Sequence, residues 1–332
     1  MKPLTVFRDS ASVLAAFSSG RDSKILDNFP RRSVKKKLFH LYLRTKAFAG
    51  NCCGFGRKVP DFEVFDGVSF SQIISKLGLN LDFNSVDILY YRNREYGRRR
   101  AYIWIGGEEE RSEGYFIKVG AGGENRKRLV SEGRVIELLD NEGVNFGYPK
   151  KYGVATIGEV TVAIYENIGI AHADVTAITW SDVDHALSEL RQKYAKTLCV
   201  DDGGAEWFRE FLSGRDSSYA ELVTGKLRGG HLQVSFLHGD MGSENVYAIN
   251  DRLYIVDWEW AGVNVPVLTD EVLFVLGNMY EAGGEEGMAN YLLERFSGGR
   301  KNGLLPALLY GAHAKFPPAE DVLNYMLKQD KL

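Results

Sequence analysis

The sequence predicts an α+β protein in which a small antiparallel sheet with one helix precedes a larger, mainly helical part. From Val86, three segments rich in β-branched and aromatic residues follow one another, separated by polar turns that contain glycine, which is typical of an antiparallel meander. A helical pattern from about Glu124 to Asp140 and two further strand patterns complete the sheet. Beyond Gly169 the periodicity is mainly helical, apart from a strand cluster between Gln233 and Asp257.

Each strand of the predicted sheet has its own sequence pattern. The first three are VDILYY, AYIWIG and GYFIKVG, and the last two lie near KYGVATIG and VTVAIYE. They define a sheet-rich part over residues 81–168 and a helical part over residues 169–332. Residues 1–80 are predicted to form an extension, mainly helical and irregular, with a short helix, FSQIISKLG, that ends at Gly78. The sequence does not indicate a role for this extension.

Size, charge and cysteine content narrow the class of protein. With 332 residues, 45% of them hydrophobic, the chain can bury a sizeable core. Its formal net charge of -3 argues against a role dominated by nucleic-acid binding, because counterion release requires a basic surface. Cys52, Cys53 and Cys199 lack the spacing of a zinc site, and their odd number favours a reducing compartment. Because the sequence has no signal-peptide pattern and no run of ~20 apolar residues, we expect a cytoplasmic protein.

The strongest chemical signal is the segment FLHGDMGSENVYAINDRLYIVDWEWAG, from Phe236 to Gly262. An apolar strand leads into a loop over residues 238–245. VYAI and LYIV follow as two strands, turned by Asn250 and Asp251. The segment therefore predicts a strand, a polar loop and a hairpin in direct succession.

Three side chains of this segment, Asp240, Asn245 and Asp257, are predicted to converge. Asp240 and Asn245 share the loop, and the hairpin returns the chain so that Asp257 lies near Asn245. Carboxylate and amide oxygens hold Mg²⁺ against nucleotide phosphates, and a further carboxylate can orient and deprotonate an attacking hydroxyl. The residue types suit phosphoryl transfer, although each residue taken alone would be explained as a turn or capping residue.

The pattern HGDxxxxN, followed by a hydrophobic strand and DWE, resembles the signature of aminoglycoside phosphotransferases and of choline and sugar kinases. The resemblance covers about residues 84–280 and implies the two-lobed protein-kinase-like fold, with ATP and Mg²⁺ as cofactors. It also implies that Asp240 is the catalytic base, that Asn245 and Asp257 are metal ligands, and that His238 supports the loop. The phosphate acceptor would be a hydroxyl group of a small molecule.

A kinase-like fold needs a lysine on its third strand and a glutamate on the following helix to orient the phosphates. Lys118, in GYFIKVG, is placed for the first role. On the helix, Glu132 shares an apolar stripe by three- and four-residue spacing, whereas Glu137 points elsewhere. We therefore expect Lys118 to pair with Glu132. The alternative is a lysine that snorkels from an edge strand and a glutamate at the rim of the stripe.

Two further segments are interpreted by their position relative to these motifs. The strand VTVAIYENIG resembles the hinge of such kinases, where backbone groups near Glu166 and Ile168 would receive the adenine edge. The loop expected to cover the nucleotide reads YYRNREYGRRR and has a single glycine, Gly97, so that arginines and backbone amides would meet the phosphates. This loop also permits a nucleotide-binding protein or scaffold with little turnover.

A protein kinase is the other alternative, and two features count against it. Asp257 is followed by Trp258 and Glu259 in place of Phe and Gly, and the sequence has no Ala-Pro-Glu segment that would close an activation loop. Asp270, in VLTDEVLFVLG, is interpreted as a residue that caps a helix start and is left out of the site.

The acceptor cannot be read from a motif. The resemblance implies a sugar, an aminoglycoside-like molecule or an amino alcohol, with a glycan or lipid-linked sugar as an extension, and it does not distinguish ATP from GTP. Acidic residues that could attract a cationic acceptor are candidates only by their charge: Asp201, Asp202, Glu206 and Glu210. The basic run from Arg31 to Lys37 is compatible with an anionic membrane surface or a phosphorylated substrate, although a solvated helix face is the simpler interpretation.

Overall fold

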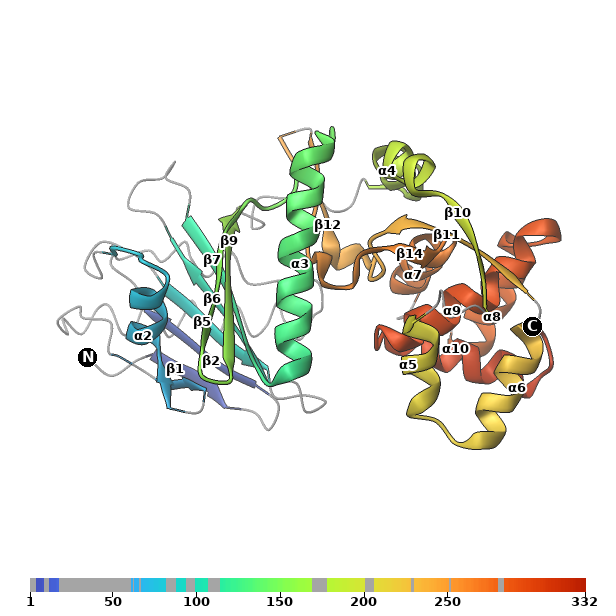
Figure 1. The fold of residues 1–332 in the computed structure, drawn as a ribbon, viewed down its shortest axis with the longest axis horizontal. Helices are drawn as coiled ribbons and strands as arrows, with labels where there is room; N and C mark the ends of the chain where they lie inside the picture. Colours follow the sequence, from blue (N-terminus) through green and yellow to red (C-terminus); the bar gives the residue numbers. More distant parts are fainter. Residues whose placement is uncertain are drawn as a thin grey trace. The chain divides into compact units, whose positions relative to one another are not determined.

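The structure is a computed structural model, and it describes the chain in separate stretches. They are residues 4–8, 12–17, 61, 63–65, 67–81, 88–93, 99–106, 114–168, 178–200, 206–227, 230–250, 252–279 and 284–332. The chain forms two compact units: unit 1 comprises Met1–Val144 with Tyr148–Asp174, and unit 2 comprises Asn145–Gly147 with Val175–Leu332. Figure 1 shows their helices and strands. The predicted α+β class is confirmed, with a sheet-rich part followed by a mainly helical part.

Unit 1 is built on a seven-stranded sheet with the order β1-β2-β5-β6-β7-β9-β8. Neighbouring strands pair antiparallel throughout. The strands are β1 (Leu4–Arg8), β2 (Ser12–Phe17), β5 (Ile88–Asn93), β6 (Arg100–Ile105), β7 (Gly114–Ala121), β8 (Lys151–Ile157) and β9 (Val160–Asn167). The strands from β5 to β9 are those that the sequence predicts, and β5, β6 and β7 form the predicted meander.

The prediction of a mainly helical extension over residues 1–80 is wrong for the part of it that the structure describes. β1 and β2 extend the sheet, because β2 pairs along the whole of β5. Residues 63–69 add the short strands β3 (Glu63–Phe65) and β4 (Val68–Ser69). Without β2, the backbone groups along one side of β5 would have no strand to pair with. The boundary predicted at residue 81 therefore cuts through unit 1, and the basic run from Arg31 to Lys37 lies outside the described residues.

The short helix predicted before Gly78 is present as α2 (Phe70–Lys76). Ser69 and Gln72 form a capping box at its N-terminus, and Gly78, at φ +66°, follows its C-terminus. Its apolar side packs on one face of the sheet, in a core that includes Phe70, Ile73, Ile74, Ile103, Ile117 and Val119. The core of unit 1 therefore lies between this face of the sheet and α2.

The second helix of unit 1, α3 (Gly123–Glu142), packs on the opposite face of the sheet, against β7, β8 and β9 (Figure 1). It ends at Gly143, whose φ of +63° is left-handed and whose N–H donates to the Leu139 carbonyl at 3.1 Å. The predicted apolar stripe is confirmed, because the buried residues of α3 are Leu129, Glu132, Gly133, Val135, Ile136 and Leu139. One carboxylate thus lies within the stripe that faces the sheet.

Unit 2 is mainly helical around a three-stranded sheet of β10 (Lys196–Cys199), β11 (His231–Leu237) and β14 (Gly262–Pro266), with β11 in the middle. A separate hairpin consists of β12 (Val246–Ile249) and β13 (Arg252–Ile255). The helices are α4 (Trp180–Tyr194), α5 (Glu206–Ser213), α6 (Ser217–Leu227), α7 (Thr269–Met279), α8 (Gly284–Arg295), α9 (Leu304–His313) and α10 (Pro317–Lys328). None of the described helices is long and apolar enough to cross a lipid bilayer.

The core of unit 2 anchors the strand that precedes the predicted catalytic loop. α9 is buried on all sides, from Leu304 to Ala312, which is typical of a central core helix. Val234 and Leu237 of β11 belong to the same core. The chain therefore leaves β11 from a fixed position at residue 238.

Candidate active site

A buried carboxylate fixes the start of the loop over residues 238–245. Asp270, fully buried in the first turn of α7, accepts hydrogen bonds from the backbone N–H of His238 at 2.9 Å and of Gly239 at 2.8 Å. Arg191 donates from Nη2 to the same carboxylate at 3.3 Å. Bonds to a charged acceptor are stronger than neutral ones, so this carboxylate holds the loop against α7.

Sequence reasoning missed this role of Asp270. It placed the residue correctly at the start of a helix, but assigned the carboxylate to capping, whereas both of its oxygens bind the loop. Asp270 is more than 30 positions away from His238 and Gly239 in the chain, so no local pattern reveals the contact. The only available signal was an acidic residue inside an apolar helix, which needs a buried partner.

Gly239 allows the loop to pass close to the 3₁₀ helix η5 (Trp258–Trp260). Its φ is +80°, and a Cβ at this position would lie 2.4 Å from the backbone oxygen of Trp260. Tyr310 donates its hydroxyl to that same oxygen at 2.8 Å. A residue with a Cβ would clash with this oxygen, so sterics explain why the HGD motif has a glycine at this position.

His238 joins the loop to the end of the hairpin. Its ring is fully buried, Nε2 donates to the Val256 carbonyl at 2.9 Å, and Nδ1 accepts from the backbone N–H of Asp240 at 3.3 Å. One donor and one acceptor define a neutral imidazole with the proton on Nε2. The ring also packs edge-on against Trp258, with centroids 4.7 Å apart. These contacts indicate that His238 supports the loop structurally.

The structure brings the backbones at Asp240, Asn245 and Asp257 together. Asn245 donates from Nδ2 to the backbone carbonyl of Asp240 at 2.7 Å. The hairpin is confirmed, with Val246 opposite Ile255, and the N–H of Val256 donates to the Asn245 carbonyl at 3.0 Å. Asp257 follows at once, so the predicted return of the chain is present.

Asp257 adopts an unusual backbone conformation at the point where β13 gives way to η5. Its φ and ψ are +66° and +59°, in the left-handed region that residues other than glycine seldom occupy. Aspartate tolerates this region better than most residues, and such outliers cluster at functional sites. The conformation sets the direction in which the carboxylate leaves the chain.

The donor atoms at Asn245 and Asp257 fit a magnesium ion. Because the amide nitrogen of Asn245 is hydrogen-bonded to the loop, its oxygen is the atom that could bind a metal. Asp257 supplies a carboxylate, and Mg²⁺ typically takes one or two protein oxygens and completes its shell with phosphates and water. Among the described residues, no group of three or more His, Cys, Asp or Glu side chains could hold a metal. An ion here would therefore depend on the nucleotide for further ligands.

Unit 1 contains the predicted ion pair. Lys118 Nζ lies 2.7 Å from Glu132 Oε1, and the two side chains are 5% and 4% exposed. Tyr165 donates its hydroxyl to the other carboxylate oxygen at 2.9 Å, and Lys118 Nζ lies 5.6 Å from the centre of the Tyr165 ring. Since β7 is an interior strand, the alternative of a lysine snorkelling from an edge strand is wrong.

Glu137 lies on the outer side of α3, as the sequence predicts. It forms an ion pair with Lys151 of β8, and its side chain is 61% exposed. The hydrogen bond from Lys151 lowers the pKa of the Glu137 carboxyl. Glu132 alone of the two carboxylates is directed at Lys118.

The other predicted site residues are only partly described. Glu166 and Asn167 end β9, Ile168 follows the strand directly, and the N–H of Glu166 donates to the Lys150 carbonyl at 2.8 Å. Glu206 and Glu210 are exposed on α5. Of the loop expected to cover the nucleotide, residues 94–98 with Gly97 lie outside the described residues, as do Asp201 and Asp202.

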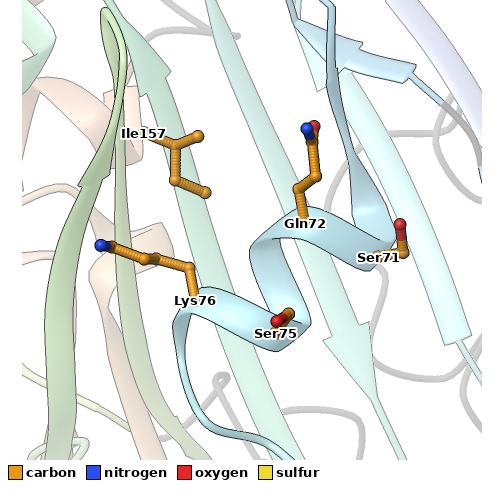
Figure 2. A pocket seen from close by; sticks show the side chains of 5 residues that line it. All are labelled: Ser71, Gln72, Ser75, Lys76 and Ile157. Carbon is orange, nitrogen blue, oxygen red and sulfur yellow. The ribbon is translucent and has the colours of Figure 1, made fainter.

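A shallow groove lies on the other side of unit 1 and is separate from these residues. Figure 2 shows its lining, which consists of Ser71, Gln72, Ser75 and Lys76 of α2 and Ile157 of β8. Ile157 packs against the core on the α2 face, whereas Lys118 lies on the α3 face. The groove is therefore not part of the candidate site.

Comparison with solved structures gives matches to small-molecule kinases. A protein described as a fructosamine-3-kinase from Haemophilus somnus is 12% identical, with 77% of this chain and 94% of that chain covered and a TM-score of 0.46. The choline kinase LicA from Streptococcus pneumoniae is 16% identical, with 69% of this chain and 82% of that chain covered and a TM-score of 0.42. A spectinomycin phosphotransferase, solved with ADP and spectinomycin, is 13% identical, with 78% of this chain and 95% of that chain covered and a TM-score of 0.45.

The chain is similar to small-molecule kinases. No protein-family model matches it, and no curated protein matches its sequence. At such low identity, only the residues of the two units themselves can indicate a function for this chain.

Proposed function

We propose that the protein transfers the γ-phosphoryl group of ATP to a hydroxyl group of a small molecule. The observation that carries this proposal is the loop over residues 238–245, held by Asp270 and joined through Asn245 and His238 to the hairpin that ends at Asp257. A rigid loop that presents a carboxylate beside two further oxygen donors is what phosphoryl transfer needs from a protein.

Asp240 is the proposed catalytic base. It would accept the proton of the acceptor hydroxyl as that oxygen forms a bond to the γ-phosphorus, while the bond to the β–γ bridging oxygen breaks and ADP leaves. Asp240 is partly exposed, so that a hydroxyl group can reach it. Its backbone N–H is bound to His238 and its carbonyl to Asn245, which fixes its position in the loop.

Asn245 and Asp257 are the proposed ligands of Mg²⁺. A bound Mg²⁺ would neutralise charge that develops on the transferring phosphoryl group. The left-handed backbone at Asp257 and the hydrogen bond at the Asn245 amide nitrogen orient these two donors before any ion arrives.

Lys118 is the proposed contact to the nucleotide phosphates, and Glu132 holds its ammonium group in place. Burying a charge pair is costly, so a pair that is 5% and 4% exposed argues for a role beyond packing. The carbonyl of Glu166 and the backbone of Ile168 would receive the adenine edge. For the acceptor, we propose a sugar, an aminoglycoside-like molecule or an amino alcohol. A cytoplasmic location stays a prediction.

Asp240→Asn tests the catalytic base. The substitution preserves size and removes the proton acceptor, so turnover should fall by at least about 10³-fold while Mg-ATP affinity stays within about twofold. Glu285→Gln, an exposed residue at the start of α8, is the matched control and should leave both unchanged. ATP consumption over a panel of sugars, aminoglycosides and amino alcohols supplies the assay. Undiminished turnover in Asp240→Asn would remove the assignment.

Asp257→Asn tests the metal ligand. Asparagine also tolerates the left-handed backbone, so the fold should be kept while one charged ligand is lost. We expect ATP affinity at millimolar Mg²⁺ to fall about 10-fold or more, and ATP affinity in EDTA to stay the same, both by calorimetric titration. An equal loss of affinity with and without Mg²⁺ would contradict the role.

A further inference from the structure

The short connection between α3 and β8, residues 145–147, belongs to unit 2, although the residues before and after it belong to unit 1. Gly147 pairs with Tyr254 of β13 in a parallel bridge. Its N–H donates to the Leu253 carbonyl at 2.7 Å, and its carbonyl accepts from the N–H of Ile255 at 2.9 Å. Because β12 pairs along the other side of β13, the hairpin is flanked by a segment that lies more than 100 positions earlier in the chain.

The two residues before Asp257, Ile255 and Val256, have all of their backbone polar groups hydrogen-bonded. The partners, at 2.9–3.0 Å, are Gly147, Asn245, Trp258 and His238. Three of them belong to the segment 236–262, which contains Asp257 itself. Gly147 is the fourth partner, and it is the one that comes from a distant part of the chain. The position from which Asp257 leaves β13 therefore depends partly on residues 145–147.

Phe146 fixes the connection through its side chain. The ring is 2% exposed and stacks on Trp258, the residue after Asp257, with centroids 5.9 Å apart and an interplanar angle of 21°. Within the described residues, it belongs neither to the core on the α2 face of unit 1 nor to the core around α9 of unit 2. The packing of this ring is thus directed at the turn that contains Asp257.

Arg252 holds the connection from the outside. This exposed side chain donates from Nη2 to the Phe146 carbonyl at 3.0 Å, and its guanidinium carbon lies 5.7 Å from the centre of the Tyr254 ring. The Tyr254 ring lies so close to Gly147 that a Cβ there would come within 2.6 Å of it. Backbone pairing, a buried ring and an arginine therefore hold residues 145–147 against β13.

We propose that residues 145–147 position the metal ligand Asp257, with Phe146 and Arg252 as positioning residues, and that they make the site selective for Mg²⁺ over larger divalent cations. The inference rests on the proposed function, in which Asn245 and Asp257 bind Mg²⁺. Phe146 and Arg252 act through the backbone of β13 and through Trp258, and neither is a proposed ligand. Groups that orient a metal ligand without binding the ion typically change metal affinity about 10–100-fold.

Selectivity follows from how firmly Asp257 is held. Mg²⁺ requires near-ideal octahedral geometry with ligands at about 2.0–2.1 Å, whereas Ca²⁺ accepts flexible geometry at about 2.3–2.6 Å. A ligand whose backbone can shift still serves the larger ion but fits the smaller one less well. Loosening residues 145–147 should therefore weaken nucleotide binding with Mg²⁺ more than with Ca²⁺.

The test measures ATP affinity by calorimetry with Mg²⁺, with Ca²⁺ and in EDTA, for the native protein and two variants. Arg252→Met keeps an unbranched side chain but removes the donor to the Phe146 carbonyl, and Phe146→Leu keeps an apolar side chain but removes the stacked ring. Both should lower ATP affinity about 10-fold with Mg²⁺ and less than about threefold with Ca²⁺, and leave it unchanged in EDTA. Arg252→Lys, which retains a donor, should restore most of the native preference for Mg²⁺.

A second measurement needs neither metal nor nucleotide. Hydrogen exchange of the Ile255 amide, which donates to Gly147, should be about fivefold faster or more in both variants than in the native protein. Arg215→Met and Phe296→Leu are the matched controls. Arg215 also binds an acceptor and lies over an aromatic ring, and Phe296 is also a buried ring of unit 2. Both controls should leave the ratio of the Mg²⁺ and Ca²⁺ affinities unchanged.

The outcomes separate the two proposals. An unchanged ratio of the two affinities in both variants, or native exchange at Ile255, would overturn the positioning role and leave the phosphotransferase proposal intact. If ATP binds the native protein equally well with Mg²⁺ and in EDTA, the proposed metal site and its positioning both fail. Because Arg252 is exposed, Arg252→Met should fold even where Phe146→Leu does not, and it then decides the test alone.

Discussion

At the scale of single residues, the ion pair between Lys118 and Glu132 is the feature whose energetics most need an explanation. Both side chains are almost fully removed from water, and the desolvation of two charges amounts to several kcal/mol per ion. Their mutual attraction and the hydrogen bond from Tyr165 offset this cost. A pair of this kind adds little net stability over an apolar pair, yet it is expensive to break. That difference allows stability and function to be separated.

Variants of the pair test stability and nucleotide binding separately. Glu132→Gln leaves the Lys118 ammonium buried without its counterion and should lower the free energy of unfolding by about 3–5 kcal/mol. The double variant Lys118→Met with Glu132→Leu replaces the pair by apolar groups and should recover most of that loss. If Lys118 binds phosphates, the double variant should still lack Mg-ATP binding. Urea unfolding and calorimetry measure the two quantities, and native nucleotide affinity in the double variant would show that the pair is only structural.

The site residues differ in how far the sequence could predict them. The Lys118–Glu132 pair could be predicted, because a carboxylate on the apolar stripe of α3 needs a buried cation and the strand before it offers one. The return of Asp257 to Asn245 followed from the hairpin, whose pattern is local. The left-handed backbone of Asp257 could not be predicted, because aspartate adopts this region only occasionally and no local pattern marks where it does.

At the scale of elements, the loop over residues 238–245 is held by a helix that follows it in the chain. Asp270 of α7 binds the loop, and Arg191 of α4 binds Asp270 through Nη2 and Asp184 through Nη1. Three elements thus meet at one guanidinium group and one carboxylate. The two carboxylates differ in burial, since Asp270 is 0% and Asp184 58% exposed. This difference provides a matched pair of substitutions.

Substitution of each carboxylate in turn tests how far the loop depends on α7. Asp270→Ala leaves the buried N–H groups of His238 and Gly239 unsatisfied, at about 1–3 kcal/mol each, so the free energy of unfolding should fall by about 3–5 kcal/mol and turnover should drop. Asp184→Asn removes an exposed partner of the same arginine and should change stability by less than about 1 kcal/mol. Urea unfolding and ATP consumption with a saturating acceptor are the measurements. Equal effects of the two substitutions would show that the loop does not depend on α7.

The elements that could be predicted from the sequence have signals within their own residues. The capping box of α2, the apolar stripe of α3 and the alternation of β5, β6 and β7 are patterns of this kind. β1 and β2 are different. They are part of the sheet because β2 pairs with β5, some 70 residues later in the chain, and such pairing leaves little trace in the local sequence.

At the scale of the whole molecule, the N-terminal part of the chain belongs to unit 1 and is not an appendage to it. Its strands β1 and β2 complete the sheet, and α2 covers the face opposite Lys118. Residues before position 81 contribute six buried apolar side chains to the core, namely Val64, Phe65, Val68, Phe70, Ile73 and Ile74. At about 2 kcal/mol each, their burial is comparable to the whole stability of a typical domain. The position of Lys118 on β7, the lysine proposed to bind phosphates, therefore depends on this segment.

Removal of residues 1–81 tests whether unit 1 folds without this segment. A chain that begins at residue 82 should fail to form a folded unit 1, because the core on the α2 face loses its cover and β5 becomes an unpaired edge. Hydrogen exchange of the β7 amides should show their protection lost, whereas a chain that begins at residue 4 should keep it. Ile73→Ala, at a fully buried position, should cost about 2–5 kcal/mol in the full chain, and Ser75→Ala, exposed on the same helix, less than about 0.5 kcal/mol. If the chain from residue 82 protects β7 as the full chain does, the first 81 residues are a separate extension, and the sheet does not need them.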